Sequence, residues 1–168
     1  MAERLNLYSP SDVIVSVAGI HTITGYADGT FIRIIKEAKP FEKQRAMDGE
    51  VSRIYNDDNV YRVELSIMQS SGSNNVLGML YNIDLATRVG KFPLFIKDTR
   101  GQTSFLSATT WIEQPPDVVF SNDLQVWTWT FGCADAAMIY GGNSEASIVE
   151  QALMVGAASL PILKQFLP

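Results

Sequence analysis

Short runs of β-branched and aromatic residues, separated by turn residues at close intervals, occupy the chain from residue 12 to residue 129. Among the residues that break these runs are Asp28-Gly29, Asp48-Gly49, Arg100-Gly101 and Pro115-Pro116. Such spacing is typical of antiparallel strands joined by tight turns. We therefore predict a mainly β fold, an antiparallel β-sandwich or partial barrel. The expected strands are residues 12–17, 31–37, 50–55, 60–69, 94–98, 103–112, 118–120 and 124–131.

Residues 60–69 carry the clearest strand pattern. Apolar and polar side chains alternate along this segment, with Tyr61, Val63, Leu65 and Ile67 set against Arg62, Glu64, Ser66 and Met68. A period of two predicts a strand with one buried face and one face that is wet or at an interface. The polar stretch Asn56–Asn59 tolerates turn geometry, and we therefore expect residues 50–55 and 60–69 to pair as a hairpin.

One amphipathic helix is expected within the β pattern. Ser73 is a suitable cap, and apolar residues then recur at helical spacing up to Ile83, so the helix should end before Gly90. A second helical segment is expected after Gly141-Gly142, interrupted at Pro161. We divide the chain into a β domain, residues 1–143, and a C-terminal helical extension, residues 144–168. This extension is apolar enough that it should pack on its own domain or on a neighbour.

Charge and residue usage exclude several functions. The 168 residues include 13 Lys and Arg and 18 Asp and Glu, a formal net charge of −5, so stable sequence-specific binding to nucleic acid is not expected. Cys133 and His21 are the only residues of their types, which excludes an intrachain disulfide and the usual cysteine or two-histidine zinc sites. No nucleotide-binding motif or nucleophile elbow is present. We expect neither a catalytic site nor a cofactor, and no enzyme.

No membrane span is expected either. The longest apolar run, residues 152–163, is about half of the ~20 residues that a transmembrane helix needs, and residues 1–7 lack the apolar core of a signal peptide. We expect a chain made in the cytoplasm. The segment from Lys36 to Glu50 mixes charges of both signs around Pro40 and is too long for a tight turn. It is either a solvated loop or a long ordered loop that contacts another molecule.

An ordered set of motifs extends over roughly residues 11–143. It comprises Ala27-Asp28-Gly29-Thr30-Phe31, Asp48-Gly49-Glu50-Val51-Ser52-Arg53, the run from Leu65 to Leu77, Trp111-Ile112-Glu113-Gln114-Pro115-Pro116-Asp117-Val118 and Trp129-Thr130-Phe131-Gly132-Cys133-Ala134-Asp135. In order and spacing this set resembles the tail tube proteins of contractile-tailed phages. The extension at residues 144–168 is not covered by the resemblance.

The resemblance implies a virion structural protein with a tail-tube type of β fold and one packed helix. Six copies would form a ring, and stacked rings would form the inner tube of the tail, through which DNA is ejected. The implied partners are the chain itself, the sheath protein, the baseplate and tail terminator proteins and, transiently in the lumen, the tape measure protein and DNA. Such a protein is made in the host cytoplasm and ends in the virion.

The resemblance, taken together with the strand pattern, indicates two groups of candidate assembly residues. Arg62, Glu64 and Ser66, on the polar face of the clearest strand, are candidates for the channel wall. The long charged loop would reach a neighbouring subunit or ring through Lys36, Glu37, Lys39, Phe41, Glu42, Lys43 and Arg45.

Two other functions remain open. The first is the inner tube of a headless contractile injection particle or secretion system, which would pass proteins in place of a genome. The second is a monomeric β-barrel that binds a small apolar ligand, which the aromatic-rich strands and the closing helix suggest.

Overall fold

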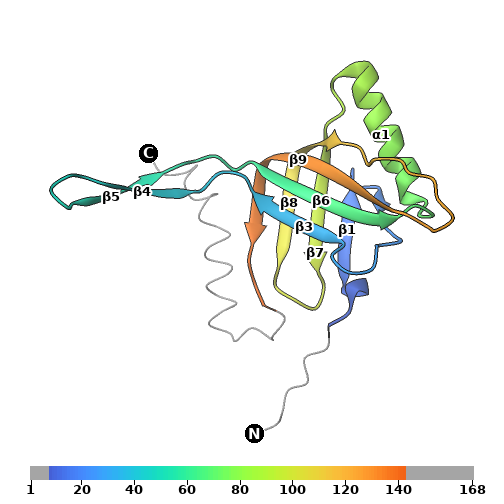
Figure 1. The fold of residues 1–168 in the computed structure, drawn as a ribbon, viewed down its shortest axis with the longest axis horizontal. Coiled ribbons are helices and arrows are strands. Elements are labelled where there is room, and N and C mark those ends of the chain that lie inside the picture. Colours follow the sequence, from blue (N-terminus) through green and yellow to red (C-terminus); the bar gives the residue numbers. More distant parts are fainter. Residues whose placement is uncertain (1–7, 143–168) are drawn as a thin grey trace, which may run out of the picture.

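Seven strands pair into one antiparallel sheet in the order β2-β1-β7-β8-β9-β6-β3 (Figure 1). The computed structural model describes residues 8–142, and the predicted extension at 144–168 lies outside them. The strands of this sheet are β1 Val13–Val17, β2 His21–Thr22, β3 Ile32–Lys36, β6 Tyr61–Met68, β7 Phe92–Asp98, β8 Ser104–Gln114 and β9 Val126–Ile139. Two further strands, β4 Phe41–Arg45 and β5 Val51–Tyr55, pair with each other, and one helix, α1 Ser73–Thr87, lies beside the sheet. The predicted mainly β, antiparallel class is confirmed.

The core lies on one face of this sheet. Along β6 the residues alternate between fully buried and partly or fully exposed, as the period-two pattern predicts. The sheet curls, so that Tyr61 of β6 and Phe105 of β8 meet with ring centroids 5.5 Å apart, although β9 lies between their strands. Complete burial of a side chain such as Phe105 or Phe131 contributes about 1.5–3 kcal/mol. The residues on the opposite face of β6 lie outside this core.

Helix α1 packs against β2 and β8 through the fully buried Leu77. It begins where the sequence predicts, but Ser73 is not its cap: Gly72 holds that position without a side-chain hydrogen bond. The Ser73 hydroxyl is buried and turns toward the sheet, where it accepts the N–H of Thr24 at 3.0 Å and bonds His21 Nε2 at 3.0 Å. The Ser73 hydroxyl therefore bonds residues that are distant in the sequence, and it does not cap the helix as the sequence predicts.

The predicted hairpin between residues 50–55 and 60–69 is wrong. β5 pairs with β4, which precedes it, and β6 pairs with β3 and β9. β4 continues outward from the end of β3 and β5 returns toward the start of β6, so β4 and β5 form a long two-stranded arm (Figure 1). The tip is the tight turn at Asp48-Gly49, where the Glu50 N–H donates to Asp48 Oδ1 at 3.1 Å. Asn56–Asn59 instead forms part of the irregular stretch at the base of the arm.

Two other strand predictions need correction. Residues 118–120, predicted as a strand, lie in the exposed connection between β8 and β9 and pair with nothing in the described part of the chain. β9 continues to Ile139, eight residues past the predicted end at 131, because its small residues pair along β8 as far as Ser104. The two-residue strand β2 was not predicted, since a segment so short has no periodicity to detect.

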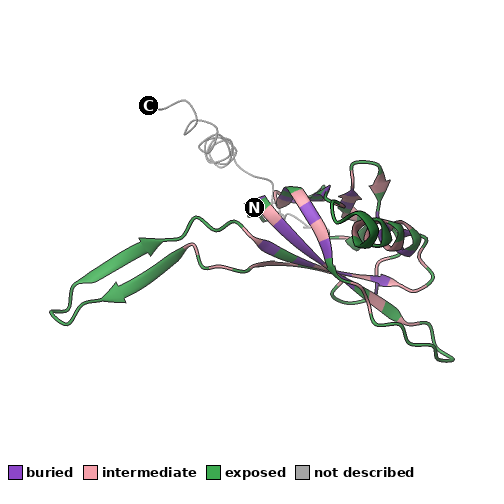
Figure 2. Ribbon diagram, turned by 90° about the horizontal axis from the view of Figure 1, so that it is seen from above, coloured by how far each residue is buried: buried purple, intermediate pink, exposed green. Residues whose placement is uncertain are grey.

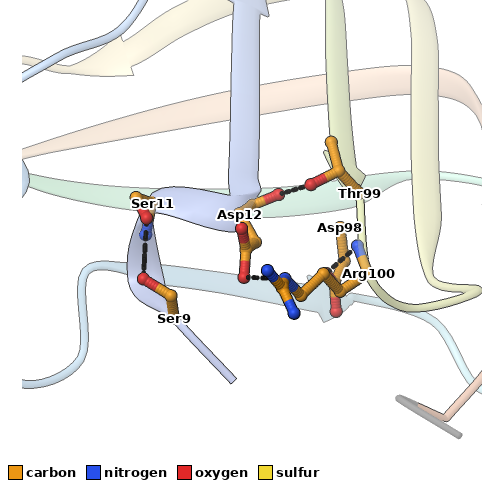
Figure 3. Close-up of polar contacts among 6 residues, drawn as sticks. All are labelled: Ser9, Ser11, Asp12, Asp98, Thr99 and Arg100. Carbon is orange, nitrogen blue, oxygen red and sulfur yellow. Dashed lines mark hydrogen bonds and ion pairs between the residues drawn. The ribbon is translucent and has the colours of Figure 1, made fainter. Parts of the chain in front are cut away.

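Asp12 ties the start of β1 to the turn that follows β7 (Figure 3). Its backbone carbonyl accepts the Thr99 N–H at 2.9 Å and the Thr99 hydroxyl at 2.8 Å. Its carboxylate pairs with Arg100, with Nε and Oδ2 2.9 Å apart. Both ends of the described part of the chain lie at this end of the sheet, far from α1 (Figure 1).

Candidate functional site

The outward face of β6 presents the three predicted channel-wall residues. Arg62 is exposed and Glu64 and Ser66 are half-buried, while Tyr61, Val63, Leu65 and Ile67 on the opposite face are buried in the core. The alternation predicted from the sequence is therefore confirmed. That this face lines a channel remains a prediction.

Neighbouring strands extend this polar face sideways. On β9, Gly132 lies opposite Arg62, Thr130 opposite Glu64 and Thr128 opposite Ser66. The Ser66 and Thr128 hydroxyls are 2.9 Å apart and share a hydrogen bond. The outward residues of the neighbouring strands in this region are Arg33 and Ile35 on β3, Thr128, Thr130 and Gly132 on β9, and Trp111, Glu113 and Gln114 on β8. We call these residues, together with Arg62, Glu64, Ser66 and Glu37, the polar face.

The charges on the polar face are mostly paired with each other. Arg62 donates from Nε to Glu37 Oε1 at 2.7 Å, and Arg33 Nη1 lies 3.7 Å from Glu64 Oε2. The hydrogen bond and the charge of Glu37 raise the pKa of Arg62 above its ordinary value, with smaller contributions from Glu113 and Glu64. Because two arginines face three glutamates, the surface has no excess of positive charge with which to hold a polyanion.

The arm, which we define as residues 41–55, projects away from the sheet (Figure 2). Every residue of β4 and β5 is exposed, as Figure 2 shows, including the aromatic Phe41 and Tyr55. An isolated two-stranded hairpin is marginally stable in water, and exposed apolar side chains on it are costly. The arm therefore has the properties of an element that is completed by a partner.

The two faces of the arm differ in charge. Cross-strand pairing places Phe41 opposite Tyr55, Lys43 opposite Arg53 and Arg45 opposite Val51, all on one face. The guanidinium of Arg53 lies 4.3 Å from the centroid of the Phe41 ring, and this cation–π contact supports a face of three cations and two aromatic rings. The other face carries Glu42, Gln44, Ser52 and Ile54. A basic, aromatic face of this kind suits an acidic partner surface.

The residues predicted to form one loop fall into two groups. Phe41, Glu42, Lys43 and Arg45 lie on the arm, in β4 and not in a loop. Lys36, Glu37 and Lys39 lie at its base, where Glu37 binds Arg62 and Lys36 Nζ donates to Asn59 Oδ1 at 3.1 Å. The first group is therefore free to meet a partner, whereas Lys36 and Glu37 hold the arm to the sheet.

A further exposed feature, which is apolar, was not identified from the sequence. The connection between β8 and β9 presents Val118, Val119, Phe120 and Leu124, and the side chain of Phe120 is 84% exposed. The signal that could have identified it is Pro115-Pro116, which ends β8 and rules out a paired strand directly after it.

No grouping in residues 8–142 has the geometry of a catalytic or metal site. His21 and Ser73 are in hydrogen-bond contact, but Ser73 is 1% exposed and its hydroxyl already holds the Thr24 N–H, so the pair fastens β2 to α1. Cys133 is buried beside Thr110. Among these residues no cluster of His, Cys, Asp or Glu could hold a metal ion. The helix in this part of the chain is too short and too polar to cross a membrane.

Comparison with known proteins gives one sequence relative and several structural ones. No protein-family model matches the sequence. The chain is 28% identical over 154 residues to structural protein ORF10 of Pseudomonas phage KPP10, a match that covers 88% of this chain and 89% of that protein.

Among solved structures, the fold is similar to a chain of the anti-feeding prophage cap, which terminates the tube of that particle. The TM-score is 0.53, and the match covers 82% of this chain and 96% of that one. A chain of the sheath-tube complex of the extracellular contractile injection system PVC gives a TM-score of 0.54, and the match covers 76% of this chain and 87% of that one. A chain of the sheath/tube terminator of the same system gives a TM-score of 0.54, and the match covers 83% of this chain and 100% of that one. Sequence identity is 16% in each case, so these likenesses show a shared fold.

Proposed function

We propose that this chain is the tube subunit of a contractile phage tail, which assembles into stacked hexameric rings and forms the conduit for DNA. The observation that carries the proposal is the two-faced sheet at β3, β6 and β9. One face forms the core, and the other presents polar residues whose charges pair with one another. Such a sheet can bury one face in its own domain and line an aqueous channel with the other.

Ring formation gives the free edges of the sheet a partner. β3 and β2 are the two edge strands of the described sheet, and β3 offers five residues with one unpaired side. Exposed edges of this kind favour pairing with further strands, and a closed ring removes them. The arm, with Phe41, Glu42, Lys43 and Arg45 exposed, would join a subunit to its neighbour in the same or the next ring.

The lumen would be lined by Arg62, Glu64 and Ser66 with the rest of the polar face. Net acidity of the chain and paired charges on this face would let DNA pass without being held, since affinity for phosphates depends on unpaired cations. The protein performs no turnover in this role. Its partners would be the sheath outside, the baseplate and terminator at the ends, and the tape measure protein and DNA inside.

The relatives support a structural role in a contractile particle. ORF10 is a structural protein of a phage, which favours passage of a genome over passage of proteins. Two of the similar folds come from an extracellular contractile injection system, and one comes from the tube-terminating cap of the anti-feeding prophage. A second candidate is the tube terminator, because two of these three structures are of a cap or a terminator. A terminator would form a single ring at the end of the tube.

Electron microscopy of the purified, concentrated protein, alone and with a matching baseplate as template, tests the proposal. A tube subunit gives hollow rings that stack into tubes, and a terminator gives single rings that do not stack. Persistent monomers in the presence of the template would contradict both roles. The amount of the chain in purified virions separates the two roles again, since a tube subunit is present in copy numbers similar to the sheath protein.

A monomeric ligand-binding barrel remains the candidate from another class. A pocket of about 450 Å³ lies between β3 and β7, with apolar walls that include Ile32, Ile34, Ile96 and Phe105. This volume lies in the range of small-molecule sites. Thermal stabilisation by an apolar ligand, without any self-assembly, would favour that function.

A further inference from the structure

The basic face of the arm is not completed by the arm itself. Lys43 and Arg53 lie directly opposite each other across β4 and β5, and like charges in such a cross-strand pair repel. Arg53 also lies over the exposed ring of Phe41. No acidic residue occupies this face of the two paired strands. A carboxylate from another surface would relieve the repulsion, and an apolar group would cover the ring.

The β8–β9 connection, residues 115–125, offers the complementary groups. It contains Asp117 and Asp123, which are both exposed, and it contains no Lys or Arg. Beside these two aspartates are four apolar residues that are each more than half exposed, Val118, Val119, Phe120 and Leu124. Exposed apolar residues that gather in this way, next to charged ones, mark an interaction surface. The connection is therefore acidic and apolar where the arm is basic and aromatic.

The arm and the β8–β9 connection extend from opposite ends of the described part of the chain. In Figure 1 the arm projects to the left and the connection to the right, and the view in Figure 2 keeps this separation. The two surfaces of one molecule therefore do not meet each other. Between two copies they can meet head to tail, and contacts of this heterologous kind close into a ring when the rotation between copies allows it.

We propose that the basic face of the arm docks on the β8–β9 connection of a neighbouring copy. The two aspartates of the connection accept hydrogen bonds from Lys43 and Arg53, and Phe120 packs against the ring of Phe41. Aromatic and Arg side chains are the usual anchors of protein interfaces, and complementary charges select one orientation of the partners. This contact presupposes the proposed assembly into rings and specifies which surface receives the arm.

A photo-crosslinker at Phe120 tests this contact in the full-length, assembled protein. Phe120 is 84% exposed, and Val89, which follows α1 and is 73% exposed, is the matched control. Each is replaced in turn by p-benzoylphenylalanine, and crosslinked peptides are identified by mass spectrometry. Mixing ¹⁴N- and ¹⁵N-labelled protein separates links within one chain from links between chains. We expect position 120, but not position 89, to crosslink to residues 41–55 of another copy.

Exchange of charge between the two surfaces is a second test. Lys43→Glu with Arg53→Glu, which we call the arm pair, should raise by about tenfold or more the concentration at which half of the protein is assembled. Asp117→Lys with Asp123→Lys should do the same. All four substitutions together should return this concentration close to that of the wild type, because the attraction is restored with its signs reversed. Sedimentation velocity measures assembly, and circular dichroism checks that each variant is folded.

The control is the arm pair combined with Asp28→Lys and Asp135→Lys, which has the same net charge and leaves the connection unchanged. The two control substitutions alone should assemble like the wild type, and in combination they should not rescue the arm pair. Equal rescue by the control, no rescue by the exchange, or crosslinks from position 120 only to residues outside 41–55 of another copy would overturn this contact although rings form. If no rings form even with a matching baseplate, the contact and the proposed function both fail.

Discussion

Gly132 of β9 lies against the indole of Trp111 on β8, so closely that a Cβ atom at Gly132 would come within 2.5 Å of Trp111 Cζ2. The indole ring covers a backbone that has no side chain of its own, on the same outward face as Arg62. The absence of a side chain at Gly132 is what allows the large ring of Trp111 to pack against the strand within the polar face.

Replacement of Gly132 with Ala should therefore destabilise the protein. The methyl group would force Trp111 or the strand to move, and overpacking of this kind costs about 1–3 kcal/mol. Urea denaturation measures the change. Gly78, inside α1, is the control because a methyl group added there would meet nothing within 4 Å, and Gly78→Ala should stabilise by up to about 1 kcal/mol. Equal effects of the two substitutions would contradict the packing described for Trp111.

The buried amide of Asn74 joins α1 to two strands. Its Nδ2 donates to the Met68 carbonyl at 3.0 Å, and its Oδ1 accepts the Trp129 indole N–H at 2.9 Å. Asn74→Ala leaves these groups without partners in the interior, and we expect a loss of about 1–3 kcal/mol in the free energy of unfolding. The exposed neighbour Asn75 is the control. A loss at Asn75→Ala as large as that at Asn74→Ala would show that helix propensity, and not the buried bonds, explains the effect.

Charge reversal on the arm should weaken assembly without unfolding the monomer. Glu42 and Lys43 are exposed and lie on opposite faces of β4, so Glu42→Lys with Lys43→Glu changes the surface that a partner would contact and leaves the core unchanged. Sedimentation velocity should show fewer rings and tubes, while circular dichroism and the melting temperature stay the same. The exposed pair Lys91 and Asp28, exchanged in the same way, serves as the control. Unaffected assembly of the arm variant would remove the arm from the proposed interface.

The thiol of Cys133 links stability to pH. Burial raises the pKa of this thiol, and hydrogen bonds from Thr110 and Ser107 oppose the shift more weakly. In the unfolded chain the thiol ionises near its ordinary pKa of about 8.5, so the unfolded state loses its proton first as the pH rises. The stability that the protonated Cys133 thiol contributes to the folded state is therefore fully present below about pH 8 and declines as the pH rises further. The free energy of unfolding should fall less between about pH 7.5 and 9.5 in Cys133→Ala than in the wild type, and parallel profiles would contradict this prediction.

Removal of acidic charge from the polar face should make assembled tubes retain DNA. Glu64 and Glu113 both contribute to the field around Arg62, and Glu64→Lys with Glu113→Lys would leave unpaired cations on this face. Binding of a short DNA duplex, followed by fluorescence anisotropy, should appear in this variant and weaken steeply with added salt. Asp28→Lys with Asp135→Lys makes the same change in net charge elsewhere. Similar binding by both variants would show that net charge alone is responsible.

Much of the sheet could be predicted from the sequence because period-two alternation is a local signal. β6 was located within one residue at each end, since Tyr61, Val63, Leu65 and Ile67 face the core and Arg62, Glu64 and Ser66 face out. The helix was found for a related reason: Leu77 is buried at the spacing that the pattern requires. The positions of β6 and α1 could be predicted because the spacing of apolar residues in the sequence shows which face of each element is buried.

The partners of the strands could not be predicted in the same way. Asn56–Asn59 and Asp48-Gly49 have similar turn chemistry, and only the pairing of β4 with β5 distinguishes the tip of the arm from its base. β4 itself is fully exposed, so it has no buried face and resembles a charged loop in the sequence. The polar face of β6 was identified, but its neighbours on β8 and β9 depend on the order of strands in the sheet.

A cryo-electron microscopy reconstruction of the assembled protein, from purified tails or from tubes grown on a baseplate, tests the central claim most directly. The account predicts a hollow tube of stacked rings in which Arg62, Glu64 and Ser66 face the channel, β3 pairs with a neighbouring subunit, and the arm contacts an adjacent copy. A channel wall made of Tyr61, Val63 and Leu65, or an assembly without a channel, would contradict it.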